Sequence, residues 1–114
     1  MIQMRFYRNG CDKSLHMEFT GHAGSAPRGE DLVCAAATML SYTAAQAVQF
    51  LYEQGKLKKP PRIVLADGSA TVVATPLPET EAETMMVFWV AQAGAHVLAR
   101  NYPKNAVLDT LHIG

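Results

Sequence analysis

Residues 32–54 have the sequence LVCAAATMLSYTAAQAVQFLYEQ, which is rich in alanine and leucine and contains no glycine or proline. This composition favours an α-helix. Gly55 follows directly, and glycine suits the position just after a helix. Asp31 precedes the run and is the expected N-cap, because its carboxylate can accept from the free N–H groups of the first turn. We therefore predict one long helix in the middle of the chain.

The segment before this helix has the pattern of a β-hairpin. Residues 2–9 (IQMRFYRN) and residues 14–20 (SLHMEFT) each alternate apolar and polar side chains, which predicts two strands with one buried face. Asn9 and Gly10 tolerate positive φ, so we expect a tight turn at this pair. The nine residues GHAGSAPRG (21–29) contain three glycines and a proline, and we expect them to form a loop.

The segment after the helix contains a second hairpin, a second helix and a last strand. Asp67-Gly68 is a strong signal for a two-residue hairpin turn. The elements predicted here are strand 62–66 (RIVLA), strand 69–75 (SATVVAT), a helix from about Thr80 to Asn101, and strand 106–113 (AVLDTLHI).

The order ββαββαβ indicates an α+β fold with two layers, in which two helices cover one face of a largely antiparallel sheet. A length of 114 residues is typical of one domain, so residues 1–114 are treated as one unit. The second helix is apolar nearly all round, as in Met85–Val90 (MMVFWV). A homodimer contact is expected to cover its excess apolar face. The alternative is that this helix packs between the sheet and the first helix.

The charge balance argues against nucleic acid as a partner. Lys plus Arg equals Asp plus Glu, so the formal net charge is zero. A local basic group exists, which we interpret as a solvated helix end and linker rather than an RNA site: Lys56, Lys58, Lys59 and Arg62.

Membrane and secretory signals are also missing from the sequence. Residues 1–10 contain no apolar signal-peptide core. The apolar stretch from Met85 to Leu98 is shorter than the roughly 20 residues needed to span a bilayer. We expect a cytoplasmic protein in which Cys11 and Cys34 are free thiols.

Reactive side chains converge only between Gly21 and Thr38. Cys34 lies three residues after the expected cap, hence in the predicted first turn of the helix, where free N–H groups favour a thiolate. His22 follows the second strand, and the loop is long enough to bring it to Cys34 as a base. The backbone N–H of Cys34 and its neighbours is then a candidate oxyanion donor.

The residue types alone leave other interpretations open. A cysteine in an alanine-rich helix is usually a small buried apolar residue, and a lone histidine is usually structural. A non-catalytic binding module and a thiol redox sensor using Cys34 therefore remain alternatives to a peptidase. Cys11, Cys34 and the four histidines show no metal-ligand spacing, so we expect neither a metal nor a cofactor. The hairpin turn fully explains Asp67-Gly68.

The stretch GHAGSAPRGEDLVCAAATML (21–40) resembles the signature of the ribosomal-processing cysteine proteases, the Prp family. That signature has Gly-His-Ala at a strand end, a loop of small residues, and Asp-x-Val-Cys-Ala-Ala on a helix. The resemblance extends over essentially the whole chain in length and element order. It implies a cytoplasmic homodimer with an α+β fold.

The resemblance also implies a substrate and a set of site residues. The expected substrate is the N-terminal extension of one protein of the large ribosomal subunit, number twenty-seven. The catalytic dyad corresponds to His22 and Cys34, and supporting positions correspond to Asp31 and Gly21. Many members have serine where this chain has Thr38, which shares a helix face with Cys34. The substrate loop is expected to be mobile until peptide binds, and its residues include Ala23, Gly24, Ser25 and Gly29.

Overall fold

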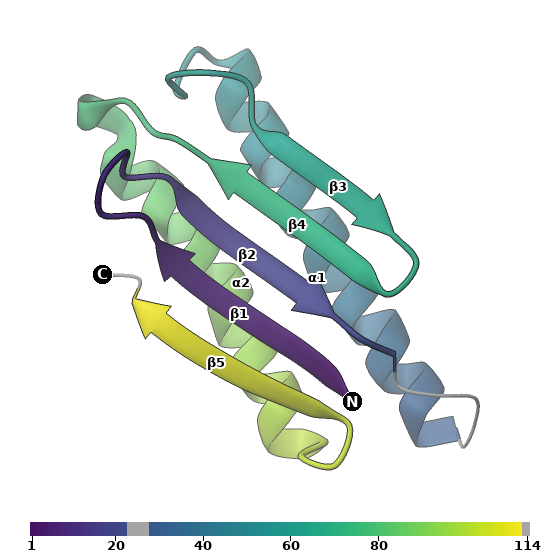
Figure 1. Cartoon of the computed structure of the whole chain (residues 1–114). Coiled ribbons are helices and arrows are strands. Elements are labelled where there is room, and N and C mark those ends of the chain that lie inside the picture. Colours follow the sequence, from purple (N-terminus) through teal and green to yellow (C-terminus); the bar gives the residue numbers. More distant parts are fainter. Residues whose placement is uncertain (23–27, 113–114) are drawn as a thin grey trace.

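The computed structural model describes residues 1–22 and 28–112, and the side chains of residues 28–31 and 110–112 lie outside this description. The elements follow the predicted order ββαββαβ (Figure 1). They are β1 (Ile2–Arg8), β2 (Leu15–Thr20), α1 (Arg28–Glu53), β3 (Arg62–Ala66), β4 (Ser69–Ala74), the 3-10 turn η1 (Pro78–Thr80), α2 (Glu81–Asn101) and β5 (Ala106–His112).

The five strands form one sheet in the order β3-β4-β2-β1-β5. The neighbouring pairs are antiparallel except β1 and β5, which are parallel. Both helices lie on one face, α1 behind β3 and β4 and α2 behind β5, β1 and β2 (Figure 1). The predicted two-layer α+β architecture with a largely antiparallel sheet is therefore confirmed.

The core lies between the sheet and the helices. The alternation in β1 places Met4 and Phe6 on the covered face, where both are fully buried. Phe88 of α2 and Val48 of α1 meet them from the other layer and are also fully buried. Burial of each such side chain contributes roughly 1.5–3 kcal/mol. The alternation of apolar and polar side chains along the strands thus determines which face of the sheet the helices cover.

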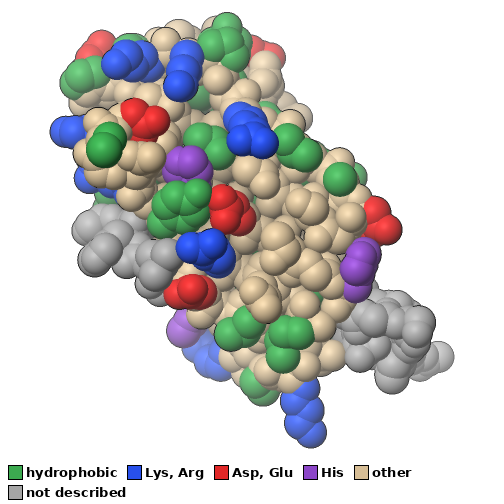
Figure 2. All heavy atoms as spheres, in the orientation of Figure 1, with side chains coloured by type: hydrophobic (Ala, Val, Ile, Leu, Met, Phe, Trp, Pro, Cys, Tyr) green, Lys and Arg blue, Asp and Glu red, His purple; other side chains and the backbone are tan. Residues whose placement is uncertain are grey.

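The open face of the sheet carries a polar and aromatic cluster. Tyr7 stacks on His16 with ring centroids 4.4 Å apart, and its hydroxyl donates to Glu18 at 2.8 Å. Partial burial lowers the pKa of His16 and raises the pKa of Tyr7. Figure 2 shows this face, where Lys and Arg side chains lie beside Asp and Glu and no single sign dominates.

The central helix begins one turn earlier than the sequence predicted. Because α1 starts at Arg28, Asp31 is its fourth residue, and the expectation that Asp31 is the N-cap is wrong. Cys34 consequently lies in the second turn instead of the first. The prediction treated Gly29 as part of a loop, but one glycine in a helix costs only about 1 kcal/mol relative to alanine. Packing of the rest of the helix outweighs that cost.

The turn between β1 and β2 also differs from the prediction. Neither Asn9 nor Gly10 has positive φ, whereas Lys13 does, with φ of 63°. The Asn9 side chain accepts from the N–H of Cys11 at 2.8 Å. An asparagine side chain that binds the backbone two residues later supports the turn without positive φ at Asn9 or Gly10, which the prediction overlooked.

Two other predicted turns are confirmed. The Asp67-Gly68 turn joins Ala66 to Ser69, and Gly68 has φ of 73°. Gly55 also has φ of 73° and follows the end of α1. Its N–H donates to the carbonyl of Tyr52, and the N–H of Lys56 donates to the carbonyl of Leu51, both at 2.9 Å. This arrangement is a Schellman motif.

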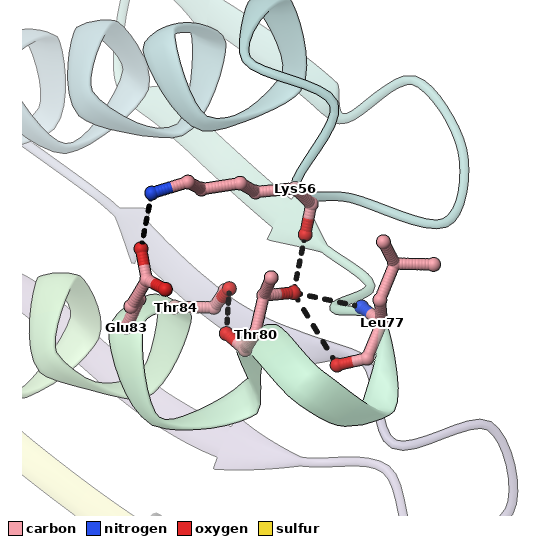
Figure 3. Close-up of polar contacts among 5 residues, drawn as sticks. All are labelled: Lys56, Leu77, Thr80, Glu83 and Thr84. Carbon is pink, nitrogen blue, oxygen red and sulfur yellow. Dashed lines mark hydrogen bonds and ion pairs between the residues drawn. The ribbon is translucent and has the colours of Figure 1, made fainter.

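The start of α2 is tied to the end of α1 through Thr80 (Figure 3). The Thr80 hydroxyl donates to the carbonyl of Lys56 at 2.5 Å and accepts from the N–H of Leu77 at 3.1 Å. Lys56 also pairs with Glu83 at 2.6 Å. Among the described residues, no helix has the length and apolar character that crossing a membrane requires.

Candidate active site

The candidate site lies where the end of β2, the β3–β4 turn and the early turns of α1 meet, at one end of the sheet (Figure 1). A cavity of about 310 Å³ opens there. Its walls come from β2, the β3–β4 hairpin and α1. The residues that line it are Ile2, Phe19, Thr20, Gly21, His22, Cys34, Ala37, Thr38, Ser41, Tyr42, Leu65, Ala66, Asp67, Gly68, Ser69 and Ala70.

The backbone of His22 is held in place by hydrogen bonds on both sides of the residue. The Met1 ammonium donates to the His22 carbonyl at 2.8 Å, and the N–H of Gly21 donates to the Gly68 carbonyl at 3.0 Å. Gly21 has φ of 100°, and a Cβ there would lie 2.3 Å from the carbonyl oxygen of Met1. Only glycine therefore fits before His22.

The imidazole of His22 lies directly against Gly68. A Cβ on Gly68 would approach Nε2 of His22 to 2.5 Å and Cε1 to 2.7 Å. The ring is exposed to solvent, so this flat glycine surface is one wall that sets its position. Because Gly68 also has positive φ, a side chain here would strain the backbone and would push the exposed ring aside.

The thiol of Cys34 reaches the same cavity from α1. Cys34 is half-buried, is not in a disulfide, and packs against the edge of the core. Val33 and Ala37 on either side of it are buried, which fixes the rotation of the helix and turns Cys34 toward the cavity. The structure thus brings His22 and Cys34 to one cavity. A thiol and an imidazole placed in this way can supply a nucleophile and a proton carrier.

One part of the expected chemistry is wrong. Only the first four N–H groups of a helix lack a partner within the helix. Since α1 begins at Arg28, the N–H of Cys34 lies inside the hydrogen-bond ladder and is not available as an oxyanion donor. The early helix start is the physical reason.

Of the other expected site residues, Thr38 and Gly21 also line the cavity. The hydroxyl that bonds back to the preceding turn belongs to Ser41, which donates to the Ala37 carbonyl at 2.9 Å; within the described residues no such bond is found for Thr38. Gly29 lies in α1 and not in a loop. Ala23, Gly24 and Ser25 lie outside the described residues, as does the side chain of Asp31.

The β3–β4 hairpin contributes residues that the sequence analysis missed. Leu65, Ala66, Asp67 and Gly68 line the cavity, as does Tyr42 on α1. We had assigned Asp67 and Gly68 to the turn alone. The missing information was the strand order, because β4 pairs with β2 and so carries the turn to His22.

A larger cavity of about 860 Å³ lies between α1 and α2. Its lining is mostly apolar and includes Met39, Leu40, Met86, Val90 and Val97. Neither His22 nor Cys34 is among the residues that border it, so it is separate from the candidate active site. Among the described residues, no three His, Cys, Asp or Glu side chains are grouped closely enough to hold a metal ion.

The sequence matches the family model described as cysteine protease Prp over residues 1–107. The chain belongs to the Prp family of cysteine proteases. The matched region contains the whole candidate site, and the resemblance seen in the sequence is confirmed. A comparison with curated proteins found no match.

Solved structures support the Prp fold. The chain is similar to SMU.848 from Streptococcus mutans, with 27% identity and a TM-score of 0.70, covering 97% of this chain and 94% of that one. It is also similar to the essential ribosomal processing protease Prp from S. aureus with a covalently linked product peptide, at 19% identity and a TM-score of 0.70. The same S. aureus protease with a substrate peptide gives 17% and 0.69. Both S. aureus comparisons cover 97% of this chain and 100% of the other.

Proposed function

We propose that this protein is a cysteine endopeptidase in which Cys34 is the nucleophile and His22 is its acid and base. The observation that supports this assignment is that both side chains line one cavity in a chain of the Prp family. Family membership indicates a cysteine protease. The assignment of the two residues is our own.

The chemistry follows in two steps. His22 first takes the proton of the Cys34 thiol. The Sγ thiolate then bonds to the scissile carbonyl carbon, the C–N bond breaks, and His22 passes that proton to the departing amine. The acyl group then remains on sulfur as a thioester. Water attacks this thioester, His22 takes the proton of the water, and the Cys34 sulfur leaves. The products are two peptides and the free enzyme.

We propose that the substrate is the N-terminal extension of large-subunit ribosomal protein number twenty-seven. The support is family membership and the likeness to a ribosomal processing protease of S. aureus that was solved with a peptide. The cavity is lined mainly by apolar and small residues, including Phe19, Leu65 and Ala70, which suits an apolar or aromatic side chain next to the scissile bond. The proposal places the protein in the cytoplasm and includes no nucleic acid, membrane or cofactor.

Supporting roles belong to residues around the dyad. Gly21 lets the chain pass Met1 so that His22 can reach the cavity. Thr38 lies one turn after Cys34 on the same helix face and borders the substrate. We assign Asp31 to the early part of the site because it lies one turn before Cys34 on α1. We assign Ala23, Gly24 and Ser25 to the substrate loop.

We further propose a homodimer formed through the helical layer. The supporting observation is the set of exposed apolar side chains on the outer side of both helices, which includes Met39, Phe50, Met86, Val90 and Val97. Exposed apolar patches of this kind mark interfaces between proteins.

Cleavage of a synthetic peptide that spans the end of the ribosomal extension tests the proposed function. We expect Cys34→Ala and His22→Ala to lower kcat by at least about 10²-fold, the lower end of typical acid–base contributions. Cys11→Ala is the matched control, because Cys11 is exposed and lies outside the cavity, and this variant should keep full activity. Cleavage that survives Cys34→Ala would contradict the mechanism.

The same assay separates the two alternatives. A binding module would hold the peptide without cutting it. A thiol redox sensor would leave the peptide intact and would form a reversible sulfenic acid or disulfide at Cys34 under mild peroxide. Mass spectrometry of the intact protein distinguishes these adducts from a peptide thioester.

A further inference from the structure

Strand β3 forms one edge of the sheet and has a free side. It is the first strand in the order β3-β4-β2-β1-β5, and within residues 1–22 and 28–112 β4 is the one strand that pairs with it. In Figure 1 no strand lies beside its outer edge. Val64 is 40% exposed and Leu65 39% exposed. An exposed apolar edge strand with free backbone groups is a ready template for another extended chain.

The hydrogen-bond alternation shows which backbone groups face outward. The N–H of Gly21 donates to the carbonyl of Gly68, and the N–H of Lys58 donates to the carbonyl of Thr75. In β4, the backbone N–H and C=O groups of even-numbered residues therefore point toward β2. Those of odd-numbered residues point toward β3. Val64 lies opposite Thr71, so it is bonded within the sheet. Since backbone groups alternate along a strand, those of Ile63 and Leu65 point away from β4.

These outward groups remain without a partner among the described residues. No backbone hydrogen bond outside the sheet pairs involves Ile63 or Leu65. Each of the two residues offers one donor and one acceptor on the same edge. The edge can thus form up to four hydrogen bonds with an incoming strand, donating two and accepting two.

The free edge runs directly into the candidate active site. Leu65 and Ala66, at the end of β3, line the cavity that also contains His22 and Cys34. A chain paired with Ile63 and Leu65 would therefore reach the thiol within a few residues, because a strand advances only about 3.3 Å per residue. This continuity identifies the occupant as the peptide on which the enzyme acts.

We propose that the extended substrate peptide adds to the sheet as a sixth strand along the free edge of β3, through the backbone groups of Ile63 and Leu65. This inference rests on the proposed function. Pairing on the backbone would fix the register of the peptide without reading its side chains. Residues of the peptide that lie opposite Ile63 and Leu65 would share their side of the sheet, where Leu65 and Tyr42 line the cavity. Apolar side chains are expected at alternate positions of the peptide.

Amide hydrogen exchange tests the pairing directly. The Cys34→Ala variant, which holds the peptide uncut, is measured free and saturated with the synthetic peptide. We expect exchange at the amides of Ile63 and Leu65 to slow by about tenfold or more when the peptide is bound. The amide of Val64 is the internal control, because it is already bonded to β4. Unchanged exchange at Ile63 and Leu65 under saturation would overturn the inference.

A pair of variants adds a functional readout. Proline is tolerated at an edge position whose N–H faces outward, so Leu65→Pro removes the donor while the ladder to β4 stays. Leu65→Ala is the matched control, because it shortens the side chain and keeps the donor. We expect Leu65→Pro to lower kcat/KM by about three- to tenfold more than Leu65→Ala, the effect of one net hydrogen bond. Alkylation of Cys34 by iodoacetamide should be equally fast in both variants.

The outcomes distinguish the proposed peptidase function from the proposed strand pairing. If the native protein does not cut the peptide, the proposed function is wrong and the pairing falls with it. If the peptide is cut but Leu65→Pro has the same kcat/KM as Leu65→Ala, the peptidase function is supported and the proposed pairing of the peptide with β3 is wrong.

Discussion

Gly68 is in contact with the imidazole of His22 and helps to set its position. A side chain at Gly68 would overlap the imidazole, with a Cβ only 2.5 Å from Nε2. We expect Gly68→Ala to displace the ring and to lower kcat for peptide cleavage by about 10²-fold, since a shift of about 1 Å in a catalytic group has effects of that size. Steady-state kinetics with the synthetic peptide measures this loss.

Gly55 provides a closely matched control for this substitution. It has the same φ of 73°, but a Cβ there would meet nothing within 4 Å. Gly55→Ala should therefore cost the same backbone strain, about 1 kcal/mol of stability, while kcat stays at the native value. Equal activity losses in the two variants would show that strain, and not contact with His22, is responsible.

At the scale of an element, Thr80 joins the two helices through one hydroxyl. Replacement by valine keeps the shape but leaves the Lys56 carbonyl and the Leu77 N–H without this partner. We expect Thr80→Val to lower the free energy of unfolding by about 1–3 kcal/mol, measured by urea denaturation. Thr80→Ser keeps the hydroxyl and should lose less. Full stability of Thr80→Val would mean that water replaces the hydroxyl without cost.

Local sequence patterns predicted the helices and strands well, but they predicted the site residues less completely. Alternation, Gly55 and the Asp67-Gly68 turn were enough to predict the order of helices and strands. The start of α1 was not predicted, because Gly29 weakens the helical signal and the segment before Asp31 was taken as part of the loop. His22 and Cys34 were predicted because their side chains are reactive and because the stretch around them resembles the Prp signature. Gly68 and Leu65 were missed because their role depends on β4 lying beside β2, a long-range pairing that no local pattern contains.

At the scale of the whole molecule, the outer side of the helical layer should determine the oligomeric state. Val90 on α2 is 63% exposed and borders the apolar cavity between the helices. We expect the native protein to sediment as a dimer, and we expect Val90→Glu to weaken the dimer by about 10²-fold or more, because an unpaired charge would be buried. Analytical ultracentrifugation over a concentration series measures this.

Val107→Glu is the control for the dimer. Val107 is 45% exposed and lies on β5 instead of on the helices. This variant carries the same apolar-to-acidic change and should remain dimeric. A native protein that sediments as a monomer at tens of micromolar would contradict the proposed dimer, and a dimer lost only in Val107→Glu would place the interface elsewhere.

The parallel pairing of β1 with β5 has a consequence for how the chain folds. Ile2 lies opposite Ala106, so β1 receives this neighbour only after the elements between β1 and β5 have been synthesised. Pairing between such distant segments is slow, because a long loop must close before any contact forms. During that interval one edge of β1 is open to other unfolded chains. Dilution during refolding should therefore raise the yield of native protein.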